Sequence, residues 1–142
     1  MTDFKALGIQ KELVKSITEI GFVNPTPIQL EAIPFLLKTN QDLIGLAQTG
    51  TGKTAAFGLP IIQQIDLSVN QVQSIILCPT RELCIQIAKD LSIYSKYLKF
   101  IKIVPVYGGT SIENQIKSIK KGAQIIVGTP GRTKDLINRK VL

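Results

Sequence analysis

The eight residues from Ala47 to Thr54, AQTGTGKT, have the composition and spacing of a phosphate-binding loop. Small residues let successive backbone N–H groups point inward around a phosphate, while Lys53 reaches the outer phosphates and the Thr54 hydroxyl can bind Mg²⁺. A helix beginning at Lys53 would add the positive end of its dipole. The alternative is a glycine turn that merely precedes a helix, and the first motif position, usually Gly, is Ala47 here. We predict a nucleotide site formed by Ala47, Gln48, Thr49, Gly50, Thr51, Gly52, Lys53 and Thr54.

Three later loops carry groups that could hold phosphodiester oxygens. They are Pro79–Arg81, the stretch around Gly108-Gly109-Thr110, and Thr129–Arg132. Each offers backbone amides, a hydroxyl or a guanidinium near the expected start of a helix. Taken singly, each has a plainer interpretation, because Pro and Gly turn the chain and Thr caps helices. Three such loops in one protein favour a track for a nucleic-acid backbone.

The elements that must position these loops alternate between strand and helix. Apolar runs predict strands over 42–46, 74–78, 101–107 and 124–128, and helices over 53–65, 81–98, 111–120 and from about Arg132. Two earlier helices are expected, one over 9–20 and one opening at Thr26-Pro27. This alternation predicts an α/β fold with a parallel β-sheet flanked by helices. In such sheets ligands bind beyond the carboxyl ends of the strands, so all four loops are expected on one rim.

Composition narrows the class of protein. The chain has 142 residues, 44% hydrophobic and 19% charged, which is typical of a single soluble domain. No apolar run approaches the ~18 residues of a membrane span, and the N-terminus has no signal pattern, so we expect a cytoplasmic protein. With no His and two cysteines, Cys78 and Cys84, a Cys/His zinc site is excluded and buried reduced thiols are expected.

The positive charge is concentrated in one part of the chain. Residues 96–142 contain ten basic and two acidic residues, against seven basic and eight acidic in residues 1–95. A basic half suits a polyanion such as nucleic acid, although a solvated lysine-rich surface explains it equally well. Aromatic residues are not interleaved with the lysines in the manner of a base-stacking platform.

Five short motifs resemble those of the DEAD-box ATP-dependent RNA helicases. The stretch Gly21–Gln29 is similar to the Q motif of that family, and AQTGTGKT matches its motif I letter for letter. Further on, Pro79–Leu83 is similar to motif Ia, Gly108-Gly109 to the glycine doublet, and Thr129–Arg132 to motif Ib. Order and spacing agree from Phe4 to Arg132, and the general character is bacterial.

The resemblance implies an incomplete RecA-like phosphate-loop domain that binds ATP and Mg²⁺, with Thr54 on the metal. Gln29 would hydrogen-bond the adenine and Phe4 would stack on it, with Thr26 and Phe22 in the same pocket. From the residues alone, Thr26-x-x-Gln29 is equally a helix capping box and the two Phe could be core residues. The residues implied to contact the RNA backbone, without selecting its sequence, are Pro79, Thr80, Arg81, Gly108, Gly109, Thr129, Pro130, Gly131 and Arg132.

The chain lacks part of the machinery that phosphoryl transfer requires. The acids after the phosphate loop are Asp66, Glu82, Asp90, Glu113 and Asp135, and none directly follows an apolar strand, where a metal-organising acid belongs. The Asp-Glu-Ala-Asp and Ser-Ala-Thr motifs of the family are absent, as is its second RecA-like domain. Only Lys53 and Thr54 remain as catalytic residues, so we expect a chain that is inactive alone.

The expected organisation is therefore an N-terminal helical segment with the Q motif (1–30) and a partial helicase domain (31–142). The parent would be a monomeric, ATP-driven RNA helicase that closes two domains around RNA. Two alternatives stay open. One is a non-catalytic, nucleotide-dependent RNA-binding module, and the other is a small-molecule kinase with the same phosphate loop.

Overall fold

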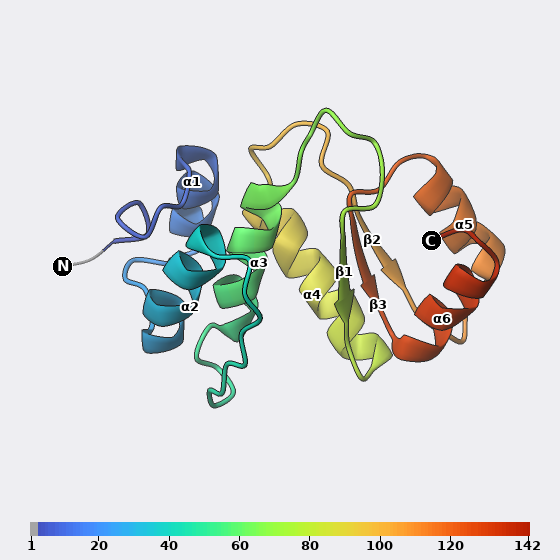
Figure 1. Ribbon diagram of the computed structural model, residues 1–142, viewed down its shortest axis with the longest axis horizontal. Helices are drawn as coiled ribbons and strands as arrows, with labels where there is room; N and C mark the ends of the chain where they lie inside the picture. The colour runs from blue at the N-terminus through green and yellow to red at the C-terminus, as the bar shows by residue number, and fades with distance from the viewer. Residues whose placement is uncertain (1–2) are drawn as a thin grey trace. The chain divides into compact units, whose positions relative to one another are not determined.

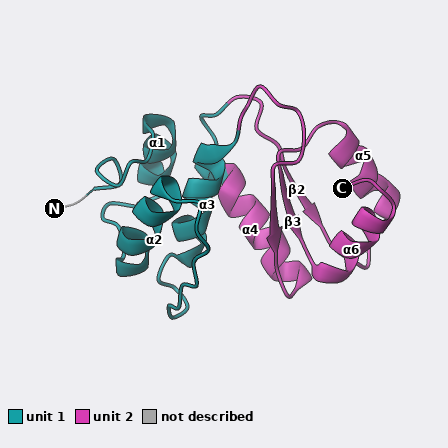
Figure 2. Cartoon of the chain, in the orientation of Figure 1, with its two compact units in different colours: residues 1–65, 93–98 teal, residues 66–92, 99–142 magenta. Residues whose placement is uncertain are grey.

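The computed structural model describes residues 3–142 (Figure 1). These residues form two compact units, coloured separately in Figure 2. Unit 1 contains the described residues up to 65 together with residues 93–98, and unit 2 contains residues 66–92 and 99–142. Within the described part of the chain, no helix is long and apolar enough to cross a bilayer.

Unit 1 is built from three helices, α1 (Lys11–Glu19), α2 (Pro27–Lys38) and α3 (Lys53–Gln64). Pro27 suits the first turn of α2, where its missing N–H has no partner to lose. Helices α2 and α3 pack on each other, and the Gln64 side-chain amide donates to the Leu36 carbonyl at 2.7 Å. The largest fully buried apolar side chains of this unit are Leu13, Ile17, Ile33, Leu59 and Ile62.

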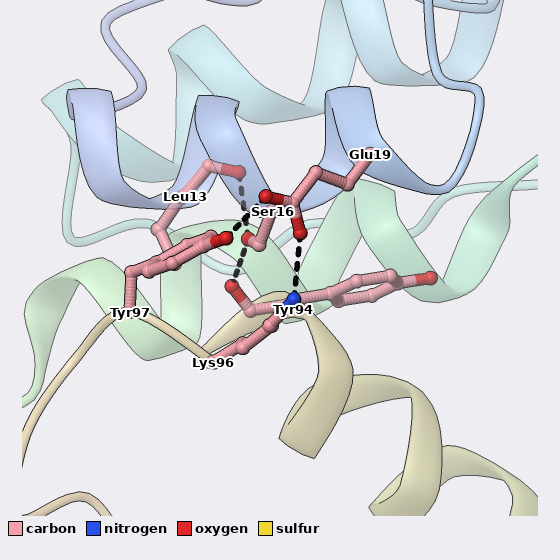
Figure 3. Close-up of polar contacts among 6 residues, drawn as sticks. All are labelled: Leu13, Ser16, Glu19, Tyr94, Lys96 and Tyr97. Carbon is pink, nitrogen blue, oxygen red and sulfur yellow. Dashed lines mark hydrogen bonds and ion pairs between the residues drawn. The ribbon is translucent and has the colours of Figure 1, made fainter.

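The segment 93–98 is attached to α1 by polar contacts (Figure 3). The buried Ser16 hydroxyl donates to the carbonyls of Leu13 and Tyr94. One turn further along α1, the Glu19 carboxylate accepts from Lys96 Nζ at 2.8 Å and from the Tyr97 hydroxyl. These contacts join positions 77 and 78 residues apart in the sequence.

Unit 2 contains a parallel three-stranded sheet in the order β1-β3-β2. The strands are β1 (Ser74–Leu77), β2 (Ile103–Val106) and β3 (Ile125–Gly128), and Leu77 and Val106 both lie level with Gly128. Every residue of the central strand β3 is buried. This burial agrees with the continuous apolar run in its sequence.

Three helices accompany the sheet: α4 (Arg81–Tyr94), α5 (Ile112–Lys120) and α6 (Pro130–Asn138). In Figure 1, α4 lies on one side of the strands and α5 and α6 lie on the other. Apolar residues from β2, β3, α5, α6 and the connection between α5 and β3 form one buried cluster, consisting of Val104, Val106, Ile119, Ala123, Ile126 and Leu136. Val72, Ile112, Ile116, Val141 and Leu142 pack around it.

Most of the predicted elements are confirmed, and one is wrong. Helix α4 ends at Tyr94 rather than 98, and α6 begins at Pro130 rather than Arg132. Residues 42–46 form no strand, and Ile44 and Leu46 are 89% and 91% exposed. A strand exists only as a paired state, and no described segment pairs with these residues. An apolar run therefore indicates strand propensity without showing that a partner is present.

The two outer strands differ at their free edges. The carbonyls of Lys102 and Val106 accept bonds from the β3 side, so the backbone of the intervening Pro105 faces away from β3. Proline at such a position presents no N–H to a further strand. On β1, Ser74 and Cys78 bond toward β3, which leaves the backbone of Ile75 and Leu77 facing outward. In the described chain, neither edge is paired on its outer side.

Candidate functional site

The phosphate loop connects residues 42–46 to the first turn of α3. Gly50 and Gly52 have φ values of +77° and +78°, which suit glycine, and Gly52 is the N-cap of α3. No side chain caps this helix, so its first amides are available to an anion. Lys53 Nζ donates to the Ala47 carbonyl at 2.7 Å, and the Thr51 hydroxyl donates to the Gln48 carbonyl at 2.6 Å. The uncapped amides, Lys53 and the Thr54 hydroxyl are a donor set that fits a nucleotide phosphate with its metal ion.

Gln29 connects α2 to the phosphate loop. It is 1% exposed; its Oε1 accepts from the Thr26 N–H and its Nε2 donates to the Gly52 carbonyl, both at 3.0 Å. The first bond is half of a capping box, while the Thr26 hydroxyl oxygen is buried without a hydrogen-bond partner. A Cβ at Gly52 would lie 2.3 Å from Gln29 Nε2. Gln29 therefore holds the loop, and its role toward adenine stays a prediction.

Phe4 and Phe22 lie in an aromatic group. Phe4 is 3% exposed and its ring stacks on Phe22 with centroids 6.2 Å apart, while Phe22 lies 6.0 Å from the Tyr94 ring. This packing agrees with a core role for both rings. Stacking of Phe4 on adenine stays a prediction, and it requires that the ring open to solvent.

A hollow of about 510 Å³ lies beside Lys53 in unit 1. Its apolar walls come from α2, α3 and the chain before the loop: Ile28, Ala32, Leu36, Leu43, Gly45, Ala56 and Phe57. A smaller hollow of about 310 Å³ lies between α2 and the loop residues Leu46–Gln48 and Thr51. Both hollows are of the size expected for small-ligand sites.

The three phosphodiester-binding candidates in unit 2 meet at the carboxyl ends of its strands. Because Leu77, Val106 and Gly128 are level in the sheet, the loops that follow them, around Pro79–Arg81, Gly108–Ser111 and Thr129–Arg132, emerge at one edge. The prediction that these three loops lie on one rim is therefore confirmed. The phosphate loop belongs to unit 1, so its place on the same rim stays a prediction.

The arginines at this edge are held by neighbouring side chains. Arg132 Nη1 donates to Gln115 Oε1 at 2.8 Å and Nη2 donates to the Thr110 carbonyl at 3.2 Å. Gln115 Nε2 donates to Thr110 Oγ1 and to the Tyr107 carbonyl, both at 3.0 Å. The Arg81 guanidinium lies 4.9 Å from the centre of the Tyr107 ring. This network fixes two cations at the edge of the sheet.

Sequence reasoning missed Gln115 and Tyr107. Gln115 has no motif signal, since it lies one turn inside a polar helix; Tyr107 precedes the glycine doublet and was only assigned to a strand. The plainer capping role is confirmed for Thr80, whose hydroxyl accepts from the Leu83 N–H at 3.2 Å. Pro130 occupies the first turn of α6 after the N-cap Thr129.

The two cysteines are free and buried, as predicted. Cys84 donates to the Val127 carbonyl at 2.9 Å, and burial raises the pKa of its thiol to about 11. Burial raises the pKa of Cys78 as well. Both groups are thus thiols at neutral pH and serve packing rather than chemistry.

Comparison with known proteins gives concordant matches. A family model for DEAD/DEAH box helicases matches residues 26–142. The ATP-dependent RNA helicase CshA of Listeria monocytogenes is 53% identical over all of this chain and 27% of its own length. The DEAD-box ATP-dependent RNA helicase CshA of Geobacillus kaustophilus is 48% identical over all of this chain and 30% of its own length. The chain therefore spans less than a third of the length of these relatives.

Two solved structures illustrate the shared fold. A DEAD box protein from Methanococcus jannaschii superposes with a TM-score of 0.93 at 42% identity, covering all of this chain and 38% of that one. Dbp5 of Saccharomyces cerevisiae, solved bound to RNA and ADP BeF3, gives 0.88 at 35% identity, covering all of this chain and 35% of that one.

A parallel sheet flanked by helices, with a glycine loop at a helix N-terminus, defines a RecA-like phosphate-loop domain. Within that class the chain belongs to the DEAD/DEAH box helicase family. This assignment removes the small-molecule kinase alternative.

Proposed function

We propose that this chain is the nucleotide-binding and RNA-contacting first domain of an ATP-dependent RNA helicase. The observation that carries the proposal is the uncapped N-terminus of α3, with Gly50 and Gly52 in left-handed conformations and Lys53 and Thr54 beside them. The names of the related proteins, and the RNA and nucleotide in the Dbp5 structure, support it. The proposal includes a second RecA-like domain in the parent, a boundary near residue 30, a monomeric state and a cytoplasmic location.

The nucleotide would be ATP with Mg²⁺. Residues Ala47–Thr54 would hold its phosphates, with Thr54 toward the metal and Lys53 on the outer phosphates. Gln29, Thr26, Phe4 and Phe22 would form the adenine side. Bound ATP supplies the phosphoanhydride bond whose cleavage the parent couples to local unwinding of RNA. The residues of this chain would position that bond.

RNA would lie along the carboxyl edge of the unit 2 sheet. Arg81 and Arg132 are held there by Tyr107 and Gln115, so little side-chain freedom is lost when they meet phosphates. The amides and hydroxyls of the three loops would complete contacts to the backbone. Since such contacts do not reach base edges, binding is expected to be independent of sequence.

A non-catalytic binding module remains the second interpretation for this chain by itself. The acids after the loop lie in exposed local contacts: Asp66 accepts from Ser68, Glu113 accepts from Ser111, and Asp135 pairs with Arg139. The described residues contain no cluster of three or more metal-binding side chains. These observations favour binding of nucleotide over its turnover.

The phosphate loop is tested with Lys53→Ala. Loss of the ammonium is expected to weaken ADP and ATP binding at least about tenfold, because a charge-assisted contact to phosphate disappears. Calorimetric titration measures the affinity. The matched control is Lys38→Ala, an exposed lysine of α2 that should bind as the parent chain does. Equal affinities in the two variants would remove the loop from the nucleotide site.

A further inference from the structure

Phe100 is exposed and lies in an unfavourable backbone conformation. Its side chain is 78% exposed, and its φ of +70° falls in the left-handed region that bulky residues rarely adopt. No ring contact involves it within the described residues. Exposure of a large apolar ring and a left-handed backbone conformation both cost stability. Such outliers are typical of positions retained for function.

Four lysines accompany this ring in unit 2. Lys99 and Lys102 flank it in sequence, Lys120 is the last residue of α5, and Lys121 is the C-cap of that helix. Lys102 Nζ donates to the Lys121 carbonyl at 2.9 Å, which brings the two segments together. We call these five residues the amino-end basic patch: Lys99, Phe100, Lys102, Lys120 and Lys121.

The patch lies at the opposite end of the sheet from Arg81 and Arg132. Its residues precede β2 or lie at the C-terminal end of α5, where the amino ends of β2 and β3 meet. In Figure 1 the arrowheads of the strands point away from this end. The patch is therefore separate from the three loops considered above.

The charge of the patch is not compensated by nearby acids. All four lysines are exposed, and none is in an ion pair within the described part of the chain. The C-terminal end of α5 stabilises Lys120 and Lys121 through the helix dipole, which explains their position but leaves their charges free. An aromatic ring among uncompensated cations is the combination that binds unpaired nucleotides.

We propose that the amino-end basic patch binds single-stranded RNA, with a base stacked on Phe100 and the flanking phosphates held by the lysines. An acidic protein segment would use the charges but would have no need of a strained, exposed ring, so the ring favours nucleic acid. Aromatic residues are not interleaved with the lysines in the sequence, but the fold brings lysines from two segments to the same end of the sheet as this ring. The inference does not depend on the carboxyl-edge loops.

Stacking can be observed directly because the chain contains no Trp. Phe100→Trp places a single indole fluorophore in the patch. Adding oligo(U) of about twelve nucleotides, a length within the site sizes of single-strand binders, should quench its fluorescence to saturation. Quenching should persist when Arg81→Ala and Arg132→Ala are added, which separates this site from the proposed RNA track.

Charge and ring are tested by two further sets of variants, with binding followed by anisotropy of labelled oligo(U). The triple variant Lys99→Gln, Lys120→Gln, Lys121→Gln should lower the slope of log affinity against log salt by about 2, since each single-strand phosphate contact contributes about 0.7. Lys5→Gln, Lys38→Gln, Lys89→Gln removes the same net charge elsewhere and should leave the slope unchanged. Lys102 is kept, because its Nζ also holds Lys121.

Phe100→Gly separates binding from folding. Glycine relieves the left-handed strain, so the melting temperature should stay equal or rise, while oligo(U) affinity falls about five- to tenfold. A structural Phe would give a lower melting temperature. The proposal is overturned if oligo(U) binds to the Phe100→Trp variant without quenching its indole, or if poly-glutamate matches oligo(U) at equal charge and Phe100→Gly leaves affinity unchanged. The latter result would assign the patch to an acidic protein partner.

Discussion

At the scale of single residues, the contact between Gln29 and Gly52 decides how the phosphate loop is held. Both amide atoms of this buried glutamine bond to the backbone, one to Thr26 and one to Gly52. The loop thereby acquires its shape before any nucleotide arrives. Such preorganisation reduces the ordering cost of binding.

Gly50 and Gly52 provide a matched comparison for this contact. Their φ values differ by one degree, but a Cβ at Gly50 meets nothing within 4 Å, whereas one at Gly52 meets Gln29. Gly52→Ala should therefore lower the melting temperature of the nucleotide-free chain more than Gly50→Ala does. In a Gln29→Ala background the two substitutions should cost the same, and a difference that persists there would show that the clash lies elsewhere. Thermal unfolding by circular dichroism measures both.

At the scale of elements, α1 and the segment 93–98 are joined by the Glu19 contacts of Figure 3. The hydrogen bond from Lys96 lowers the pKa of Glu19 below its ordinary value, and the bond from Tyr97 adds to this. A lowered pKa stabilises the folded chain above the ordinary value of about 4.3, and this stabilisation disappears as the pH falls through the lowered one.

Glu19→Gln is accordingly expected to have a pH-dependent effect. The variant should melt at a lower temperature than the parent chain at pH 7, with a small difference because the pair is exposed. The two should converge as the pH falls below the lowered pKa of Glu19, where the parent carboxylate is protonated too. Glu31→Gln, an exposed α2 residue, is the control and should show no such convergence. A Glu19 difference that is constant with pH would contradict a role for its charge.

The sequence predicted structure best where that structure depends on residues that are close together in the chain. The helix starts at Pro27 and Lys53 and the buried strand at 125–128 all depend on neighbouring residues, and all three are confirmed. The strand expected over 42–46 depends on a distant partner, which no local pattern reports. Gln115 and Tyr107 were missed for the same reason, because their partners Arg132 and Arg81 are distant in sequence.

At the scale of the whole molecule, binding and turnover of ATP are expected to be separate properties. The chain holds the phosphate loop but places no acid directly after a strand, so it should bind ATP and hydrolyse it far more slowly than an RNA-stimulated helicase. Phosphate release with and without RNA measures this, with Lys53→Ala as the background. Rapid release that is lost in Lys53→Ala would show that one of the present acids serves the reaction.

The positively charged residues of unit 2 lie at both ends of its sheet. Arg81 and Arg132 lie at the carboxyl ends of the strands, and the amino-end basic patch lies at the other end. The net charge of the whole chain does not reveal that these residues form two separate groups. Two separate cationic surfaces would let one RNA strand be contacted at both ends of the sheet.

The two edge strands of the sheet differ in how well they can pair with a further strand. At β2 an arriving strand would meet the ring of Pro105, which donates nothing, whereas at β1 it would find the free amides and carbonyls of Ile75 and Leu77. A further strand would therefore pair more fully on the β1 side than on the β2 side, where Pro105 lacks one donor. One proline thus biases the side on which the sheet can be widened.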